Sequence, residues 1–108
     1  MEIDINKMFS FLNENQLNAI REIVRDGYWG DCSEEFNGET HYAHGYYTNL
    51  NKGKKWSGTL SGISKAIKAS GTNLISMCSD WWGDGSGDMM FFNMDLIEEK
   101  NLITWANQ

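Results

Sequence analysis

The strongest constraint on the fold is a run of alternating side chains near the end of the chain. Between residues 89 and 96, every second side chain is large and apolar: Met90, Phe92, Met94 and Leu96. A repeat of two residues is typical of a β-strand and does not fit a helix. We therefore predict a strand over residues 89–96, paired in a hairpin with a strand over residues 74–82.

Two other segments show the spacing of amphipathic helices. The first is predicted over residues 14–26, after a short helical turn within residues 5–12. Its apolar stripe is Leu17, Ile20, Ile23 and Val24. Asn13 and Gln16 have the spacing of a capping box. Gly27 suits a left-handed helix stop.

The second helix is predicted over residues 59–70, with Ser57 or Thr59 as its N-cap. A further strand is predicted over residues 41–48. Residues 101–106 are predicted as a last strand or a short helix, and Ile103, Thr104 and Trp105 favour the strand. Residues 28–40 and 49–58 are predicted to be loops. The chain has no proline, so its turns must use glycine, asparagine, aspartate and serine.

The order of these elements is α-β-α-β-β-(β). It predicts an α+β fold, a small antiparallel sheet of three to four strands with two helices packed on one face. The 108 residues suit a single domain spanning residues 1–108. No apolar run approaches the ~18 residues of a membrane span, and no signal peptide is visible. With only two cysteines, Cys32 and Cys78, we expect a cytoplasmic protein with reduced thiols and no membrane contact.

Charge is unevenly distributed along the chain. The net charge is −6 overall, but residues 40–79 carry five lysines and no acidic residue. The two flanking blocks, residues 1–39 and 80–108, are both acidic. An acidic average repels nucleic acid, so we expect a protein partner with a basic surface. The basic middle block would attract nucleic acid, which therefore stays an alternative partner.

The two acidic blocks each contain an aromatic-Trp-Gly-Asp segment, at residues 28–31 and 81–84. Exposed aromatic side chains rimmed by charge are typical of interfaces. We therefore expect a small acidic binding protein that acts by protein–protein contact, with no catalytic residue. One concrete form is an inhibitor that mimics nucleic acid and blocks a nucleic-acid-binding enzyme, of the anti-restriction or anti-CRISPR type. The residues predicted to bind the partner are Trp29, Asp31, Glu34, Glu35, Trp81, Trp82, Asp84 and Asp88.

An alternative is a metal-binding protein or metal-dependent enzyme built on Asp80, Asp84 and Asp88. Three carboxylates within nine residues would bind calcium or magnesium. Two positions that supply oxygen ligands in a helix-loop-helix calcium loop are Trp82 and Phe91 here, so the pattern is incomplete. If no metal binds, this segment is a solvated hairpin loop and the protein has no cofactor.

Zinc is also weakly indicated. Cys32, His41, His44 and Cys78 lack the paired spacing of a zinc knuckle. They are more simply two buried thiols and two imidazoles on the surface of a strand.

A second alternative is an anion- or nucleic-acid-binding module in the basic block. Lysines, glycine and a hydroxyl side chain directly before a predicted helix are the components of a phosphate site. The residues concerned are Lys52, Lys54, Lys55, Trp56 and Thr59.

Overall fold

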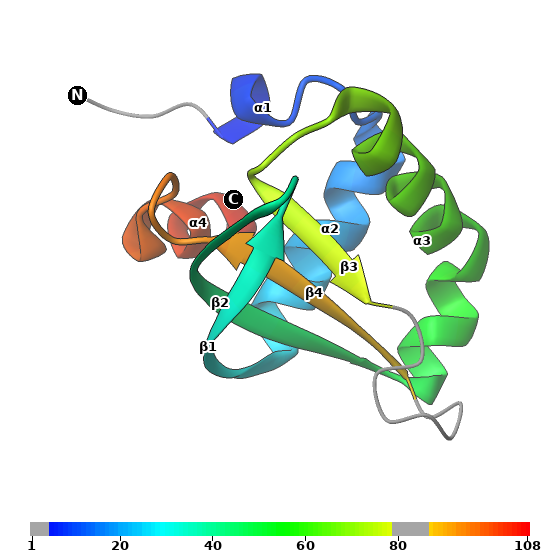
Figure 1. Ribbon diagram of the computed structural model, residues 1–108. Coiled ribbons are helices and arrows are strands. Elements are labelled where there is room, and N and C mark those ends of the chain that lie inside the picture. The colour runs from blue at the N-terminus through cyan, green and yellow to red at the C-terminus, as the bar shows by residue number, and fades with distance from the viewer. Residues whose placement is uncertain (1–4, 79–86) are drawn as a thin grey trace.

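The strands of the protein form a four-stranded antiparallel sheet in the order β1-β2-β4-β3, which confirms the predicted α+β class (Figure 1). The computed structural model describes residues 5–78 and 87–108, and side chains throughout these ranges except at residues 49–57. Four helices flank the sheet. In chain order the elements are α1 (Ile5–Met8), α2 (Glu14–Asp26), β1 (Tyr28–Phe36), β2 (Glu39–Asn49), α3 (Leu50–Ser70), β3 (Ile75–Cys78), β4 (Gly87–Asn93) and α4 (Glu99–Ala106).

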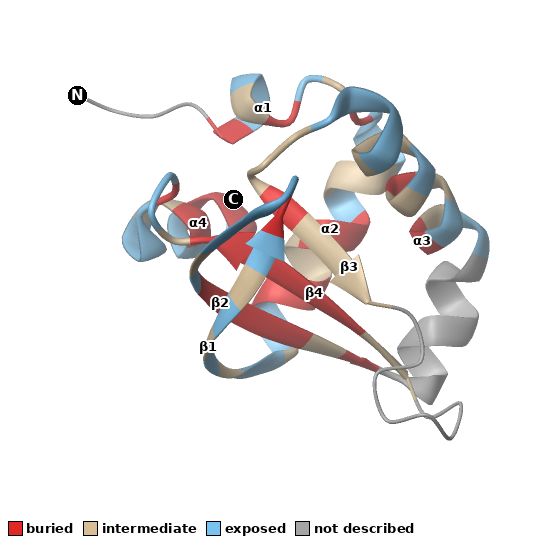
Figure 2. Ribbon diagram, viewed as in Figure 1, coloured by how far each residue is buried: buried red, intermediate tan, exposed pale blue. Residues whose placement is uncertain are grey.

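Many residues of β2 and β4 are buried, as the red bands in Figure 2 show, and apolar clusters lie on both faces of the sheet. Met90 and Phe92 of β4 face the helices and belong to the main core. Met89 and Phe91 face the other way and form a smaller cluster with Phe36 of β1 and Ala43 of β2. β1 contacts β3 and β4, which are not its neighbours in the sheet, so the sheet curls around this smaller cluster.

Helix α2 lies behind the sheet in the view of Figure 1 and contacts both α3 and α4. Its predicted start is confirmed. The Asn13 side chain accepts a hydrogen bond from the Gln16 N–H at 2.8 Å, and the Gln16 side chain accepts one from the Asn13 N–H at 3.0 Å. This capping box satisfies two amide groups that a helix start leaves unpaired.

The predicted left-handed stop at Gly27 is wrong, because its φ is −115°. Glycine is required there for a different reason, which is the close approach of β2. The Gly27 carbonyl accepts a hydrogen bond from the Tyr47 N–H at 2.5 Å. A Cβ atom on Gly27 would lie 2.4 Å from the Tyr47 carbonyl oxygen.

The predicted loop over residues 28–40 is also wrong. Residues Tyr28–Phe36 form β1, and Phe36 pairs with Glu39 of β2 across the two-residue turn Asn37-Gly38. Both turn residues have positive φ, 49° and 88°. Asn-Gly is the favoured sequence for such a turn because its twist matches that of the paired strands.

Helix α3 begins at Leu50, so the predicted loop over residues 49–58 is helical. Thr59 and Ser57 are therefore interior residues of α3 and not its N-cap. Gly53 and Gly58 suggested a loop, but a glycine inside a helix costs only about 1 kcal/mol relative to alanine. The predicted helix end holds, since α3 stops at Ser70 and Gly71 follows with a φ of 66°.

The predicted last strand is a helix, α4. Leu102, Trp105 and Ala106 are buried, at the spacing i, i+3 and i+4 of one helix face. Ile103 and Thr104, whose β-branched side chains suggested a strand, are exposed on the other face. The burial of Trp105 against α1 and α2 overrides that local preference. No helix in the described part of the chain is both long and apolar enough to span a membrane.

Candidate binding site on the β1–β2 hairpin

A β-bulge at the start of β1 brings Tyr28 and Asp31 to the same face of the sheet. Tyr28 pairs with Tyr46, and Gly30 pairs with Gly45, so Trp29 is one extra residue in β1. Residues three apart in a regular strand point to opposite faces. The extra residue cancels this difference, and the Tyr28 hydroxyl donates a 2.5 Å hydrogen bond to Oδ1 of Asp31. Bulges are frequent beside functional sites because they redirect a side chain in this way.

The Asp31 carboxylate is the centre of a polar cluster. Its Oδ1 atom lies 3.0 Å from Nε2 of His44, the residue directly opposite on β2. The Tyr42 hydroxyl also hydrogen-bonds with this carboxylate and lies 3.3 Å from the same Nε2 atom. One carboxylate thus binds two phenol groups and one imidazole.

The buried side chain of His44 packs against this cluster from the interior of the sheet. Only 3% of the residue is exposed, so the prediction of a surface imidazole is wrong for His44. The Tyr28 and Tyr42 rings both pack edge-on to the imidazole, with ring centroids 5.7 and 5.5 Å away. Nδ1 of His44 is buried and has no hydrogen-bond partner among the described residues. The tautomer with its proton on Nε2 fits best, because it donates to Asp31 and leaves only an acceptor unpaired.

These hydrogen bonds fix the charge of the cluster. The hydrogen bonds from Tyr28 and Tyr42, together with His44, lower the pKa of Asp31. The hydrogen bond with Asp31 raises the pKa of Tyr28 to about 12 and also raises the pKa of Tyr42. The cluster therefore holds one carboxylate anion and two neutral phenols at neutral pH.

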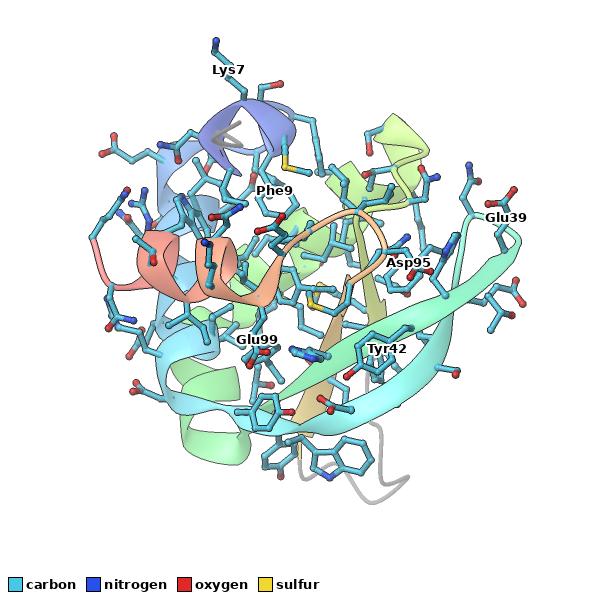
Figure 3. The ribbon with its side chains drawn as sticks, turned by 90° about the vertical axis from the view of Figure 1, so that its left-hand side faces the viewer. Lys7, Phe9, Glu39, Tyr42, Asp95 and Glu99 are labelled. Carbon is cyan, nitrogen blue, oxygen red and sulfur yellow. The ribbon has the colours of Figure 1, made fainter. Side chains whose placement is uncertain are left out.

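The hairpin presents large apolar side chains to solvent. Tyr28, Trp29 and Tyr42 are 55%, 45% and 47% exposed. The hairpin from Tyr28 to Asn49 also contains four carboxylates and no lysine or arginine. Figure 3 shows Tyr42 and Glu39 of the hairpin on the same side of the molecule as two further acidic residues, Asp95 and Glu99. We call this surface, defined by Tyr28, Trp29, Asp31 and Tyr42, the hairpin face.

A pocket of about 310 Å³ lies beside the hairpin face. It is bounded by the last turn of α2, by α4 and by the first residue of β1. Its lining combines two tyrosine rings, apolar side chains and two opposite charges: Val24, Arg25, Tyr28, Tyr46, Glu99, Ile103 and Asn107. Tyr28 thus belongs to both the hairpin face and the pocket.

The structure groups only part of the predicted partner-binding set. Trp29, Asp31, Glu34 and Glu35 all lie on β1, and Trp29 and Asp31 belong to the hairpin face. Asp88 lies on β4 and pairs with Thr48, four residues along β2 from the partner of Asp31, which separates the two acids by roughly 13 Å along the strands. Trp81, Trp82 and Asp84 lie outside the described residues.

The structure describes only one residue, Asp88, of the alternative metal site. Asp80 and Asp84 of the proposed metal loop lie outside the described residues. Within the described ranges, no group of three or more His, Cys, Asp or Glu side chains is arranged to hold a metal ion. The metal site at Asp80, Asp84 and Asp88 therefore stays a prediction.

The anion site loses its geometric basis. Lys52, Lys54, Lys55 and Trp56 belong to α3 and do not precede it. Thr59 lies ten residues into this helix, and its hydroxyl accepts a 3.1 Å hydrogen bond from the Asn15 side chain of α2. The site was predicted because these residues would lie at the start of a helix, and that expectation is wrong.

Several residues of the candidate site were missed from sequence. Tyr28, Tyr42 and Glu99 were not singled out, and His44 was placed on the surface. The Asn37-Gly38 turn is the signal that would have found the Asp31–His44 pair, because counting outward from it places these residues opposite each other. Tyr28 also depends on the bulge, and Glu99 on the position of α4. Comparison with protein-family models, curated protein sequences and solved structures finds no match to this chain.

Proposed function

We propose that the protein is a binding protein that acts by contact, and that the hairpin face is where its partner docks. The observation that carries this proposal is the pair of exposed tyrosine side chains on the Asp31 carboxylate, with the exposed Trp29 next to Tyr28 in β1. Tyrosine and tryptophan supply a large share of binding energy at protein interfaces. Hydrogen bonds from two of these rings to Asp31 also restrict their motion before binding, which lowers the entropy cost of association.

Charge complementarity indicates the kind of partner. The hairpin from Tyr28 to Asn49 has four carboxylates and no lysine or arginine, and Asp95 and Glu99 add negative charge outside it (Figure 3). A partner with a basic surface would be attracted to this face and oriented by it. The specific form of the proposal is that this basic surface is the groove in which an enzyme binds nucleic acid, so that the protein competes with nucleic acid.

Affinity capture followed by reconstitution tests the proposal. The immobilised protein should capture a basic protein from cell lysate, and the purified pair should bind less tightly as salt increases. The double variant Tyr28→Ser/Tyr42→Ser should weaken this binding by at least about thirtyfold, since two interface anchors are lost. The matched control Lys65→Ser/Lys68→Ser truncates two exposed side chains of α3 and should bind like wild type.

The outcomes separate the general proposal from its specific form. Equal binding by the tyrosine variant and the wild type, or no captured protein, would contradict a docking role for the hairpin face. Excess duplex DNA should displace the protein if the partner uses its nucleic-acid groove. Binding that persists under excess DNA would exclude the nucleic-acid mimic and leave another basic surface as the partner.

A further inference from the structure

The pocket beside the hairpin face has the chemistry of a cation site. We propose that it binds an alkylammonium group, which in the complex is a lysine side chain of the partner. This inference rests on the proposed function for the identity of its occupant, but the pocket itself can be tested without the partner. The argument comes from its ring geometry, its carboxylates and the position of its one cation.

Two tyrosine rings form a corner of the pocket. The rings of Tyr28 and Tyr46 have centroids 5.5 Å apart and planes at 71°. The face of an aromatic ring carries partial negative charge and attracts ammonium groups. The exposed Tyr28 ring offers such a face, and Tyr46 lines the pocket from the side of the core. Tyr46 is 2% exposed and packs edge-on to Phe92 of the core, so this corner is held rigidly.

Carboxylates add negative charge to the same corner. Glu99 lines the pocket from the first turn of α4, and Figure 3 shows it on the same side as Tyr42. Within the described residues, no lysine, arginine or histidine forms a salt bridge with Glu99. The charge of Glu99 contributes to the raised pKa values of Tyr28, Tyr42 and Tyr46, which places it electrostatically close to all three. Asp31 adds a second negative charge through its hydrogen bond with the Tyr28 hydroxyl.

Arg25 is the one cation in the lining, and it is already engaged. Its Nη1 atom donates a 3.1 Å hydrogen bond to the Ala106 carbonyl, in the last turn of α4. A helix C-terminus carries partial negative charge, so Arg25 is bound to that helix end. Glu99 in the lining, Asp31 on the Tyr28 hydroxyl and the Tyr28 ring therefore favour a cation over an anion at the Tyr28–Tyr46 corner.

Titration with small ions tests the pocket directly. The probes are n-butylammonium and tetramethylammonium chlorides, with n-butanol and sodium butyrate as neutral and anionic controls at matched ionic strength. Both cations should shift the ring NMR signals of Tyr28 and Tyr46 in a saturable way. The controls should not do so.

Two charge-matched variants locate the binding. Glu99→Gln should weaken alkylammonium binding about fivefold, because it removes the carboxylate from the lining. Glu98→Gln removes the same charge one residue away, where the side chain is exposed and makes no cap hydrogen bond. This control should change the affinity less than about twofold. Tyr28→Leu should weaken binding while Tyr28→Phe, which keeps the ring, should retain most of it.

Three results would overturn the inference. Butyrate binding at least as tightly as butylammonium would assign the pocket to an anion on Arg25. Equal losses in the Glu98 and Glu99 variants would reduce the effect to overall charge, and a lack of saturable shifts at Tyr28 and Tyr46 would exclude the site.

Failure of the proposed function gives a different pattern, in which alkylammonium binds but no protein partner does. Conversely, a partner that binds the Glu99→Gln variant as tightly as the wild type would leave the function intact and remove the lysine pocket.

Discussion

Asp31 and His44 face each other as directly paired residues of β1 and β2, with 3.0 Å between Oδ1 and Nε2. The exposed carboxylate joins this buried imidazole to two exposed phenol rings. It therefore links the interior of the sheet to the hairpin face. Removing the charge of Asp31 should change the ionisation of both tyrosines while leaving the backbone intact.

Asp31→Asn should lower the pKa of Tyr28 from about 12 towards its usual value of 10.0, because the tyrosinate would no longer face a carboxylate. The pKa of Tyr42 should fall for the same reason. Spectrophotometric pH titration of tyrosine ionisation, with Tyr28→Phe to assign the signal, measures both. Glu35→Gln removes a nearby charge without removing a hydrogen bond to either tyrosine and serves as the control. An unchanged Tyr28 titration in the Asp31 variant would refute the hydrogen-bonded arrangement.

Deleting Trp29 should remove the bulge and restore regular pairing at the start of β1. Tyr28 would then lie two residues before Asp31, and residues two apart in a regular strand share a face, so the raised pKa of Tyr28 should persist. Trp29→Ser keeps the residue count, so the bulge and the raised Tyr28 pKa should both persist. Tyrosine titration of the two variants makes the comparison. A Tyr28 pKa that falls towards 10.0 in both variants would show that the indole, and not the register of β1, controls the position of Tyr28.

Gly27→Ala should destabilise the fold by about 2–3 kcal/mol, because the new Cβ would overlap the Tyr47 carbonyl and push β2 away from α2. Gly58→Ala provides the contrast. A Cβ atom there meets no atom within 4 Å, and alanine favours a helix, so stability should rise by about 0.5–1 kcal/mol. Denaturant unfolding measures both changes. Equal and small effects at the two positions would contradict the close approach of α2 and β2.

His41 should make the stability depend on pH. Its imidazole lies between Asp95, at 2.9 Å, and Glu39, at 3.3 Å, and the hydrogen bond with Asp95 followed by that with Glu39 raises its pKa from 6.5. The folded state therefore favours protonated His41. The stabilisation is complete below the unfolded pKa of 6.5 and is lost as pH rises through the higher folded value.

His41→Gln tests this sign. The difference in unfolding free energy between wild type and variant should be largest near pH 5 and should shrink towards pH 9, where His41 is neutral in both states. Asp95→Asn, which removes the partner with the larger effect, should reduce the same pH dependence. A wild-type advantage that grows with rising pH would contradict the assignment.

Helices and strands that carry a clear pattern of apolar or capping residues in their own sequence were predictable. The alternation of Met90, Phe92, Met94 and Leu96 predicted a strand over residues 89–96, of which β4 contains residues 89–93 while residues 94–96 form a turn. The start of α2 follows from the Asn13–Gln16 capping box. β1 was missed because the side chains between Trp29 and Phe36 are small or acidic and none of them is fully buried, so no apolar alternation marks the strand. Its only local signal is the Asn37-Gly38 turn. α4 was missed because Ile103 and Thr104 favour strands, whereas the burial of Trp105 depends on packing against distant helices.

The candidate site was predictable only in part. Trp29 and Asp31 were identified because exposed aromatic and acidic residues are typical of interfaces. The cluster around Asp31 requires the strand register, the extra residue at Trp29 and the position of α4, and none of these follows from residue types alone. The basic segment at Lys52–Lys55 was misjudged because its glycines concealed a continuous helix.

The position of β1 in the strand order has a consequence for self-association. Among the described strands, β1 pairs with β2 alone, so it is an edge strand. It is nine residues long, and an exposed edge strand can pair with a strand of a second chain. Asp31, Glu34 and Glu35 place negative charge along this edge. Two copies brought together edge to edge would bring like charges into contact, and the lowered pKa of Asp31 preserves part of that repulsion in mildly acidic solution. The carboxylates of the hairpin would thus also disfavour aggregation through this edge.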